Sequence, residues 1–355
     1  MTHRERIFSV IHGEMPDVVP CWGECPMDVT VFRDIMPEMC GDPIKDLITH
    51  NEFFDNSVIS PVGVGLAQET ISQDNDHHIY RYETGAVWRE CYNPTFSREA
   101  VSYPINDPVE ALKYSMLDAG SPEKLNVDET RKTIKLLKDR GYFVEGSVIG
   151  AWYGIYYFLA SFENILMWMA SEPKAAHTLF DMTTEFSLKS AERLLDCGVD
   201  CIFTASDLGS GNSLLFSKSM YYEYVNPWLT ELATLCHSKG AYLHLHSHGH
   251  IEDIMDGIVA SGVDILNPVG PSDHNDLAMF KREWGSALTL HGGISTTISE
   301  MNHEQILDHV AEVMNIGCVG GRFIPRTESG IPPMSVEMAK YYIDTLRSER
   351  EKGYR

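Results

Sequence analysis

The sequence has few basic residues. Its 355 residues include 28 lysines and arginines against 51 aspartates and glutamates, which gives a formal net charge of −23. Proteins that bind nucleic acids or anionic membranes need a basic surface, so we exclude both partners. The sequence also lacks a signal-peptide-like apolar start and any run of about 18 apolar residues that could span a membrane. We therefore expect a cytoplasmic protein.

Two further patterns are missing. The 8 cysteines include no C-x-x-C pair, and small disulfide-stapled proteins are shorter and denser in cysteine, so we expect reduced thiols. No G-x-G-x-x-G loop follows the first apolar strand, where the chain reads Cys21-Trp22-Gly23-Glu24-Cys25-Pro26. A dinucleotide-binding, doubly wound sheet is therefore disfavoured.

Short apolar segments alternate with helix-length amphipathic segments. The predicted strands are 18–22, 57–60, 142–148, 200–204, 241–246, 264–267, 287–290 and 321–324. The predicted helices of the regular part are 128–140, 172–196, 217–238, 251–261, 275–284, 303–316 and 335–348. Eight strands separated by helices predict an α/β fold, a (β/α)₈ TIM barrel.

The first third of the chain decorates this barrel. A capping box from Thr2 to Glu5 predicts a short N-terminal helix, and the alternating runs 78–82 and 86–89 around Thr84-Gly85 predict a hairpin. We expect one domain over 1–355, with a decorated part at 1–125 and a regular β/α part at 126–355.

Histidines gather where one predicted strand ends. His244, His246 and His248 alternate, so an extended chain would point all three to one face. Neutral imidazole is a common zinc ligand, and we predict His246 and His248 as metal ligands. The alternative is a histidine-rich strand end that only hydrogen-bonds a neighbouring loop.

Other strand ends supply further candidates, because the chemistry of such barrels lies there. Asp207, His291 and Glu24 are candidate catalytic residues. Asp207 could instead cap a turn, Glu24 and Glu328 could be solvated surface residues, and His291-Gly292-Gly293 could be a turn that lets backbone approach a ligand.

An aromatic patch supplies the candidates for cofactor binding. Trp152 and Tyr153 could wall a planar cofactor, together with Asn267 from a strand end, although such aromatic patches are more often core.

The order of several motifs resembles the uroporphyrinogen decarboxylase superfamily, which includes the cobamide-dependent methyltransferases that act on coenzyme M. The motifs are 16–20, 148–152, 198–200, 217–227, 246–249, 262–268, 292–294 and 329–333. The resemblance implies a (β/α)₈ barrel.

The decarboxylase branch of this superfamily carries an arginine-rich segment after the first strand and an acidic residue after the second. Both are missing here, where the corresponding stretches are 22–28 and 59–62. An octa-anionic porphyrinogen is therefore a poor substrate for this acidic chain.

The methyltransferase branch carries a His-x-Cys-Gly strand end and a later Cys before Gly, which bind zinc. His246 matches the histidine, His248 replaces the first cysteine, and Ser329 replaces the second. The resemblance therefore implies an altered zinc site, made of two imidazoles and Glu328 or another carboxylate such as Asp207. It also implies zinc as a Lewis acid and a corrinoid carried by a partner protein.

The resulting hypothesis is a methyltransferase that moves a methyl group between the corrinoid's cobalt and a small molecule, either a thiol acceptor or a methylated or methoxylated donor. The alternatives are a decarboxylase and a barrel that binds a corrinoid or tetrapyrrole without catalysis. Barrels of this kind are often dimers, so a homodimer remains open.

Overall fold

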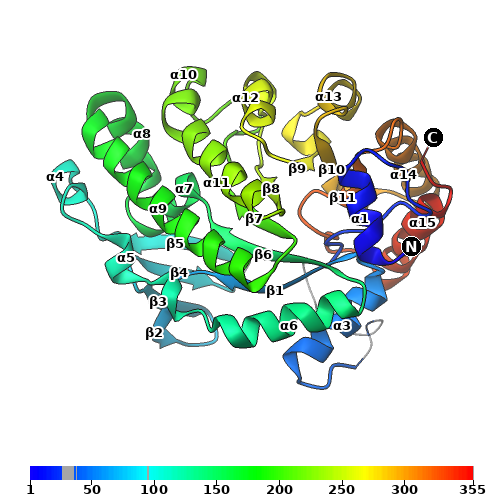
Figure 1. Cartoon of the computed structure of the whole chain (residues 1–355), viewed down its shortest axis with the longest axis horizontal. Helices are drawn as coiled ribbons and strands as arrows, with labels where there is room; N and C mark the ends of the chain where they lie inside the picture. Colours follow the sequence, from blue (N-terminus) through cyan, green and yellow to red (C-terminus); the bar gives the residue numbers. More distant parts are fainter. Residues whose placement is uncertain (26–35, 37, 94–95, 355) are drawn as a thin grey trace.

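Seven parallel strands form the central sheet of the computed structural model, which describes residues 1–25, 36, 38–93 and 96–354. The strands are neighbours in chain order, and the sheet curls into the barrel seen in Figure 1. They are β1 (Val58–Val64), β6 (Phe143–Ile149), β7 (Cys201–Ala205), β8 (Tyr242–His246), β9 (Ile265–Val269), β10 (Thr289–Ile294) and β11 (Phe323–Thr327). The predicted (β/α)₈-type fold is confirmed.

Helices follow the strands and line the outside of the barrel (Figure 1). They are α3 (Pro43–Phe54), α6 (Val127–Asp139), α7 (Ala151–Phe158), α8 (Phe162–Ser171), α9 (Pro173–Cys197), α10 (Lys218–Met220), α11 (Asn226–Ser238), α12 (Met255–Ala260), α13 (Leu277–Trp284), α14 (His303–Gly317) and α15 (Val336–Glu351). The predicted helix 217–238 contains a π-helical turn at Tyr221–Val225, between α10 and α11. The other predicted helices of the regular part agree to within a few residues.

The predicted first strand, 18–22, is not a regular strand. Only Cys21 forms a bridge there, parallel to Asn56, and the Ser57 amide donates to the Cys21 carbonyl at 2.7 Å. On the other side the Glu24 carboxylate accepts from the Thr327 amide at 2.7 Å and from the Tyr342 hydroxyl at 2.8 Å. A side chain therefore replaces part of a strand ladder at the seam between β1 and β11.

The N-terminal helix α1 (His3–Ile11) closes the amino-terminal end of the barrel. Its capping box at Thr2 and Glu5 is present as predicted. Ile7, Val10 and Ile11 are buried against residues at the starts of five strands: Val58, Phe143, Cys201, Ile265 and Ile324. Entry to the barrel interior is therefore left to the opposite, carboxyl end of the strands.

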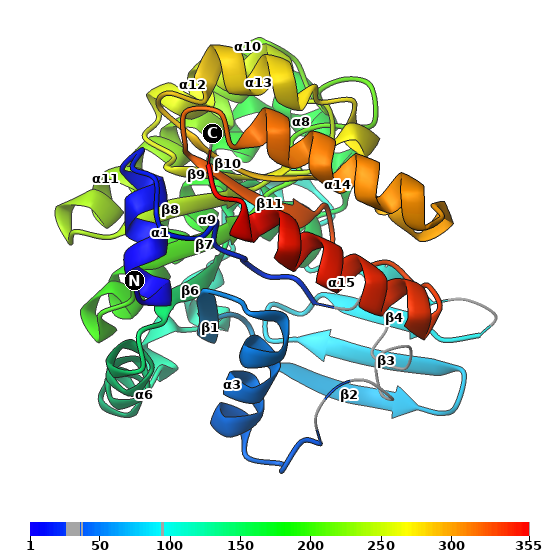
Figure 2. The ribbon, with the colours of Figure 1, turned by 90° about the vertical axis from the view of Figure 1, so that its right-hand side faces the viewer.

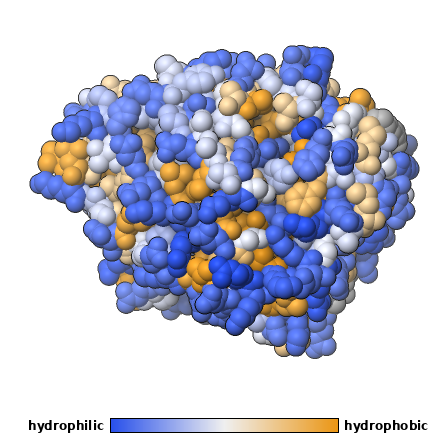
Figure 3. Space-filling view, in the orientation of Figure 1, coloured by the Kyte–Doolittle hydropathy of each residue, from blue (hydrophilic) through white to orange (hydrophobic). Residues whose placement is uncertain are grey.

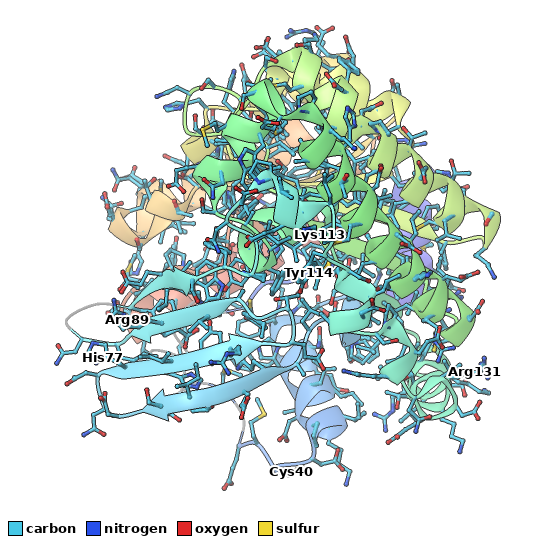
Figure 4. The ribbon with its side chains drawn as sticks, turned by 90° about the vertical axis from the view of Figure 1, so that its left-hand side faces the viewer. Cys40, His77, Arg89, Lys113, Tyr114 and Arg131 are labelled. Carbon is cyan, nitrogen blue, oxygen red and sulfur yellow. The ribbon has the colours of Figure 1, made fainter. Side chains whose placement is uncertain are left out.

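A second, four-stranded antiparallel sheet lies beside the barrel (Figure 2). Its strands are β2 (Gln68–Gln73), β3 (His77–Tyr82), β4 (Val87–Cys91) and β5 (Ser97–Ser102). The predicted hairpin is β3 and β4, and β2 and β5 extend it on both sides. Figure 4, which labels His77 and Arg89, shows these strands extending away from the β/α part.

The small sheet is anchored on α7. The Trp88 indole donates to the Tyr157 carbonyl at 3.0 Å and stacks on the Tyr157 ring at a centroid distance of 4.1 Å. Arg98 donates to the Tyr157 hydroxyl at 2.7 Å. Because α7 directly follows β6, this packing brings the sheet to the carboxyl end of the barrel.

The face of the molecule in Figure 3 is mostly hydrophilic, with apolar residues in small patches. This agrees with the excess of acidic side chains. Among the described residues, no helix is long and apolar enough to cross a membrane. None of the eight cysteines, all of which lie in the part of the chain that the structure describes, forms a disulfide.

Candidate functional site

A row of polar side chains crosses the barrel interior, where bulky aliphatic residues are the usual filling. Glu145 on β6 accepts from Ser60 at 2.9 Å and contacts His244 Nδ1 on β8 at 2.8 Å. His244 Nε2 lies 3.4 Å from His291 Nδ1, and His291 Nε2 donates to the Trp22 carbonyl at 3.0 Å. Glu145, His244 and His291 are at most 5% exposed.

The Trp22 carbonyl fixes the direction of these hydrogen bonds. A carbonyl only accepts, so His291 carries its proton on Nε2 and accepts through Nδ1 from His244 Nε2. His244 Nδ1 can then meet Glu145 in two ways: as an imidazolium facing a carboxylate, or as a neutral ring facing a protonated acid. In both cases the Glu145/His244 pair has no net charge. Burial, together with nearby cationic groups, holds the pKa of His291 well below its usual value.

A second layer lies closer to the carboxyl end of the barrel. Asn267 on β9 accepts through Oδ1 from His246 Nδ1 at 2.7 Å and from Arg326 Nη1 at 3.2 Å, and its amide nitrogen donates to the His291 carbonyl at 3.0 Å. The proton of His246 is therefore on Nδ1, and Nε2 keeps its lone pair. Burial and the neighbouring His248 lower the pKa of His246 to about 3.

His248 lies beyond the end of β8, so the predicted alternation stops at His246. Its Nδ1 contacts Asp273 Oδ2 at 2.9 Å and its Nε2 contacts Ser329 Oγ at 3.2 Å. The His246 and His248 rings meet edge to face, 4.8 Å apart. Burial opposes charge on His248, but Asp273, Asp207 and Glu328 outweigh it and raise the pKa of His248.

Two glycines position the loop that carries His248. Gly249 has φ of +89°, and a Cβ there would lie 2.0 Å from the Gly209 carbonyl carbon. The loops after β7 and β8 therefore touch backbone to backbone. Asp207 contributes to the same contact, because its Oδ1 accepts from the His248 amide at 2.9 Å.

The predicted zinc ligands do not form a metal site as they are placed. Both nitrogens of His248 are engaged, and the Glu328 carboxylate accepts from the Ser272 amide at 2.8 Å. In the part of the chain that the structure describes, no three histidine, cysteine or acidic side chains group so that they could hold a metal ion. The positions corresponding to the zinc ligands of the methyltransferase branch, 246, 248 and 329, nevertheless lie together, with side chains that favour proton transfer over thiolate coordination.

The three candidate catalytic residues have separate places. His291 is fully buried behind His244. Glu24 is 2% exposed and its carboxylate holds the barrel seam, which differs from the solvated surface considered for it. Burial raises the pKa of Glu24 in spite of its hydrogen bonds. Asp207 holds the loop of His248 through a hydrogen bond to an amide 41 residues away, which differs from the local turn cap considered for it.

Trp152 is a core residue. It is fully buried, it stacks with Phe180, and its indole donates to the Asp207 carbonyl at 2.9 Å. A ring without an exposed face cannot wall a cofactor, so this assignment is corrected to the core alternative. Its neighbour Tyr153 is partly exposed and lines a cavity.

Two cavities share Phe203 as a lining residue. The polar cavity, about 270 Å³, is lined by Trp22, Cys25, Glu145, His244 and Arg326, among others. The apolar cavity, about 360 Å³, is lined by Val64, Val148, Ile149 and Tyr153, among others. A small polar molecule and an apolar group can thus lie side by side.

Sequence reasoning missed Glu145, Asp273 and Arg326. Glu145 is a charged residue inside an apolar strand, which is a usable signal because a buried carboxylate needs a partner. Arg326 lies in the polar run at the end of the last strand, but nothing in the run distinguishes it. Asp273 lies 25 residues from His248 in the sequence, and only the tertiary fold joins them.

The comparisons with known proteins agree on the family and fold. The family model of "Uroporphyrinogen decarboxylase (URO-D)" matches residues 97–348. A search of curated proteins returned no match.

Two solved structures match nearly the whole chain. A methyltransferase from Methanosarcina mazei is 18% identical, with a TM-score of 0.68 and 99% of each chain covered. A putative vitamin-B12 independent methionine synthase from Listeria monocytogenes is 10% identical, with a TM-score of 0.50 and coverage of 94% of this chain and 96% of that one. At these identities the likeness concerns the fold.

Proposed function

Because this chain belongs to the uroporphyrinogen decarboxylase family, we propose that it is a methyltransferase of that family, acting between a corrinoid protein and a small molecule. The observation that carries the proposal is the cluster of His246, His248 and Ser329 at the carboxyl end of the barrel. The resemblance to the methyltransferase branch aligns these positions with its zinc ligands, and in this chain their side chains contact one another. The full-length match to a methyltransferase fold supports it.

The chemistry requires a proton at a defined place. When a methyl group leaves an oxygen or sulfur of the small molecule as a cation, the bonding electron pair stays on that heteroatom, which then needs a proton. His248 is suited to deliver it, because Asp273 stabilises its imidazolium. In the opposite direction neutral His248 takes the proton from a thiol as the thiolate attacks the methyl group.

Other residues orient the reaction. Asn267 keeps the His246 Nε2 lone pair available as an acceptor, and the corrinoid would supply the cobalt that accepts or donates the methyl group. Both roles of His248 rest on its contacts with Asp273 and Ser329.

Methyl transfer to or from free cobalamin tests the proposal. The protein is incubated with methylcobalamin and a panel of thiols, or with cob(I)alamin and a panel of methyl ethers, and the corrinoid spectrum is followed. We expect turnover by the wild type and a rate lower by roughly 10²-fold in Asp273→Asn, since an oriented acid/base contributes about that factor. A wild-type protein that is inert with both panels, or an unimpaired Asp273→Asn, would contradict the proposal.

A decarboxylase is the second candidate, and one contact favours it. The decarboxylase branch carries an acid in a Phe-Ser-Asp-Ile-Leu segment after its second strand, and the corresponding stretch 59–62 of this chain, which contains Ser60, has none. Glu145 from the next strand lies 2.9 Å from the Ser60 hydroxyl and so returns a carboxyl group to that place. Release of carbon dioxide from uroporphyrinogen or a smaller acid, without any change in the corrinoid spectrum, would support this candidate over the first.

A further inference from the structure

Arg326 is a cation without an acidic partner in the polar cavity. Its side chain extends from β11, is half-buried and lines the cavity. The neutral Asn267 side chain accepts from Nη1, while Nε is buried and has no hydrogen-bond partner. Among the described residues, no carboxylate forms an ion pair with it.

The nearest acidic groups are committed elsewhere. Glu24 lines the same cavity and its charged form is stabilised by Arg326, but its carboxylate oxygens accept hydrogen bonds from Thr327 and Tyr342 and form no ion pair with Arg326. Glu145 is compensated by His244, as the hydrogen-bond directions require. Among the described residues, Arg326 therefore has an unpaired Nε and no ion-pair partner, and the charge of Glu24, which lines the same cavity, acts on it without a direct bond.

The backbone makes room for this guanidinium. Gly23 has φ of +72°, and a Cβ there would lie 3.2 Å from Arg326 Cζ. Gly23 belongs to the segment in which the decarboxylase branch carries its arginines. Here one arginine from the last strand reaches the same part of the cavity.

Resting on the proposed function, we propose that the small-molecule substrate carries a single anionic group, a carboxylate or a sulfonate, and that Arg326 binds it. A guanidinium pairs well with such oxyanions, and an unpaired half-buried arginine gains from a bound one. The cavity of about 270 Å³ admits a small acid but not a tetrapyrrole with many carboxylates.

Binding measured without any corrinoid tests this assignment. Isothermal titration compares 4-methoxybenzoate with its neutral analogue 4-methoxybenzamide, and methoxyacetate with 2-methoxyethanesulfonate. We expect each anion to bind, and 4-methoxybenzoate to bind at least tenfold more tightly than the amide. The comparison of methoxyacetate with 2-methoxyethanesulfonate shows whether the site prefers a carboxylate or a sulfonate. Equal binding of acid and amide, or no binding of any of these acids, would overturn the assignment.

Variants of Arg326 test whether its side chain binds the anion. Arg326→Gln should weaken 4-methoxybenzoate binding by about tenfold or more, since it removes a charged hydrogen bond. Arg326→Lys, which keeps the charge, should retain a measurable preference for acid over amide. The matched control is Arg282→Gln on α13, whose exposed side chain pairs with Glu283. An Arg326→Gln protein that is folded by circular dichroism and binds the acid like the wild type would contradict the assignment.

Different experimental results would contradict the methyltransferase proposal and the assignment of Arg326. Selective anion binding with no methyl transfer would leave Arg326 assigned and remove the methyltransferase. Methyl transfer from neutral ethers at a rate that Arg326→Gln leaves unchanged would support the methyltransferase and contradict the role assigned to Arg326.

Discussion

At the scale of single residues, Asn267 has the largest effect on the chemistry of the site. One amide orients His246, contacts Arg326 and reaches the backbone of His291. It thereby links the two polar layers of the barrel. The fixed protons on His246 Nδ1 and His291 Nε2 both follow from carbonyl oxygens that can only accept.

The burial of neutral His246 predicts a pH dependence of stability. Its pKa is about 3 in the folded protein, against 6.5 for a free side chain. Below pH 6.5 the unfolded chain therefore binds a proton that the folded protein refuses, and stability falls as the pH falls. Between pH 7 and pH 5 this group should remove about 2 kcal/mol from the free energy of unfolding.

Urea unfolding at the two pH values, with a chelator present, measures this effect. The drop from pH 7 to pH 5 should be smaller in His246→Gln than in the wild type. The exposed His303 supplies the control, since His303→Gln should keep the full drop. Equal drops in all three proteins would show that His246 is not held neutral.

The engaged side chains of His248 and Ser329 predict how a zinc site could be restored. The double variant His248→Cys/Ser329→Cys places two thiols beside the His246 Nε2 lone pair, and thiolates bind zinc strongly. We expect elemental analysis to find about one zinc per chain in the double variant and less in the wild type. A double variant that is folded but binds no more zinc than the wild type would contradict the placement of these three positions.

At the scale of elements, the reactive site depends on the contact between two loops. Gly249 combines a positive φ with an approach of 2.0 Å between its would-be Cβ and Gly209. Gly240 has a similar φ of +72° but nothing within 4 Å of its would-be Cβ. Comparing alanine substitutions at Gly249 and Gly240 therefore separates the cost of backbone strain from the cost of a clash between the two loops.

Gly249→Ala should therefore cost more than Gly240→Ala. Strain alone costs of order 1 kcal/mol, and the clash adds to it only at Gly249. Denaturant unfolding measures the stability of both variants, and the cobalamin assay measures their activity. Gly249→Ala should also lower the rate because it displaces His248. Equal stability and activity of the two variants would mean that the loop contact is dispensable.

Elements were predictable from the sequence where one strong local pattern sufficed. Amphipathic helices such as 303–316 and apolar strands such as 241–246 agree closely with α14 and β8. The segment 18–22 was misjudged, because its apolar residues are buried without a regular strand ladder. β2 and β5 lack an apolar pattern, since their side chains are almost all exposed.

The candidate site was predictable only in part, for a related reason. His246 and His248 are close in the sequence, so their proximity is a local property. Their partners Asn267, Asp273 and Ser329 come from other strand ends, and hydrogen bonds across the barrel decide which donors remain free. The spacing of residues in the sequence does not reveal these contacts, so the sequence predicts the metal ligands without Asp273.

At the scale of the whole molecule, the barrel is closed at one seam by the Glu24 carboxylate. Glu24→Gln replaces an acceptor that Thr327 and Tyr342 use, so a buried donor loses its partner. We expect the free energy of unfolding to fall by about 1–3 kcal/mol. Denaturant unfolding measures the change, and Glu14→Gln, at an exposed site in the same region, is the control. A Glu24→Gln protein as stable as the wild type would rule out this role.

The plug formed by α1 also has a kinetic consequence. Since Ile7, Val10 and Ile11 fill the amino end of the barrel, the opposite, carboxyl end is the mouth left for the small molecule. A corrinoid protein delivering cobalt to the polar cavity must cover the same mouth. Under the proposed function, the small molecule then enters before the partner docks and leaves after it departs, which is a compulsory order of binding and release.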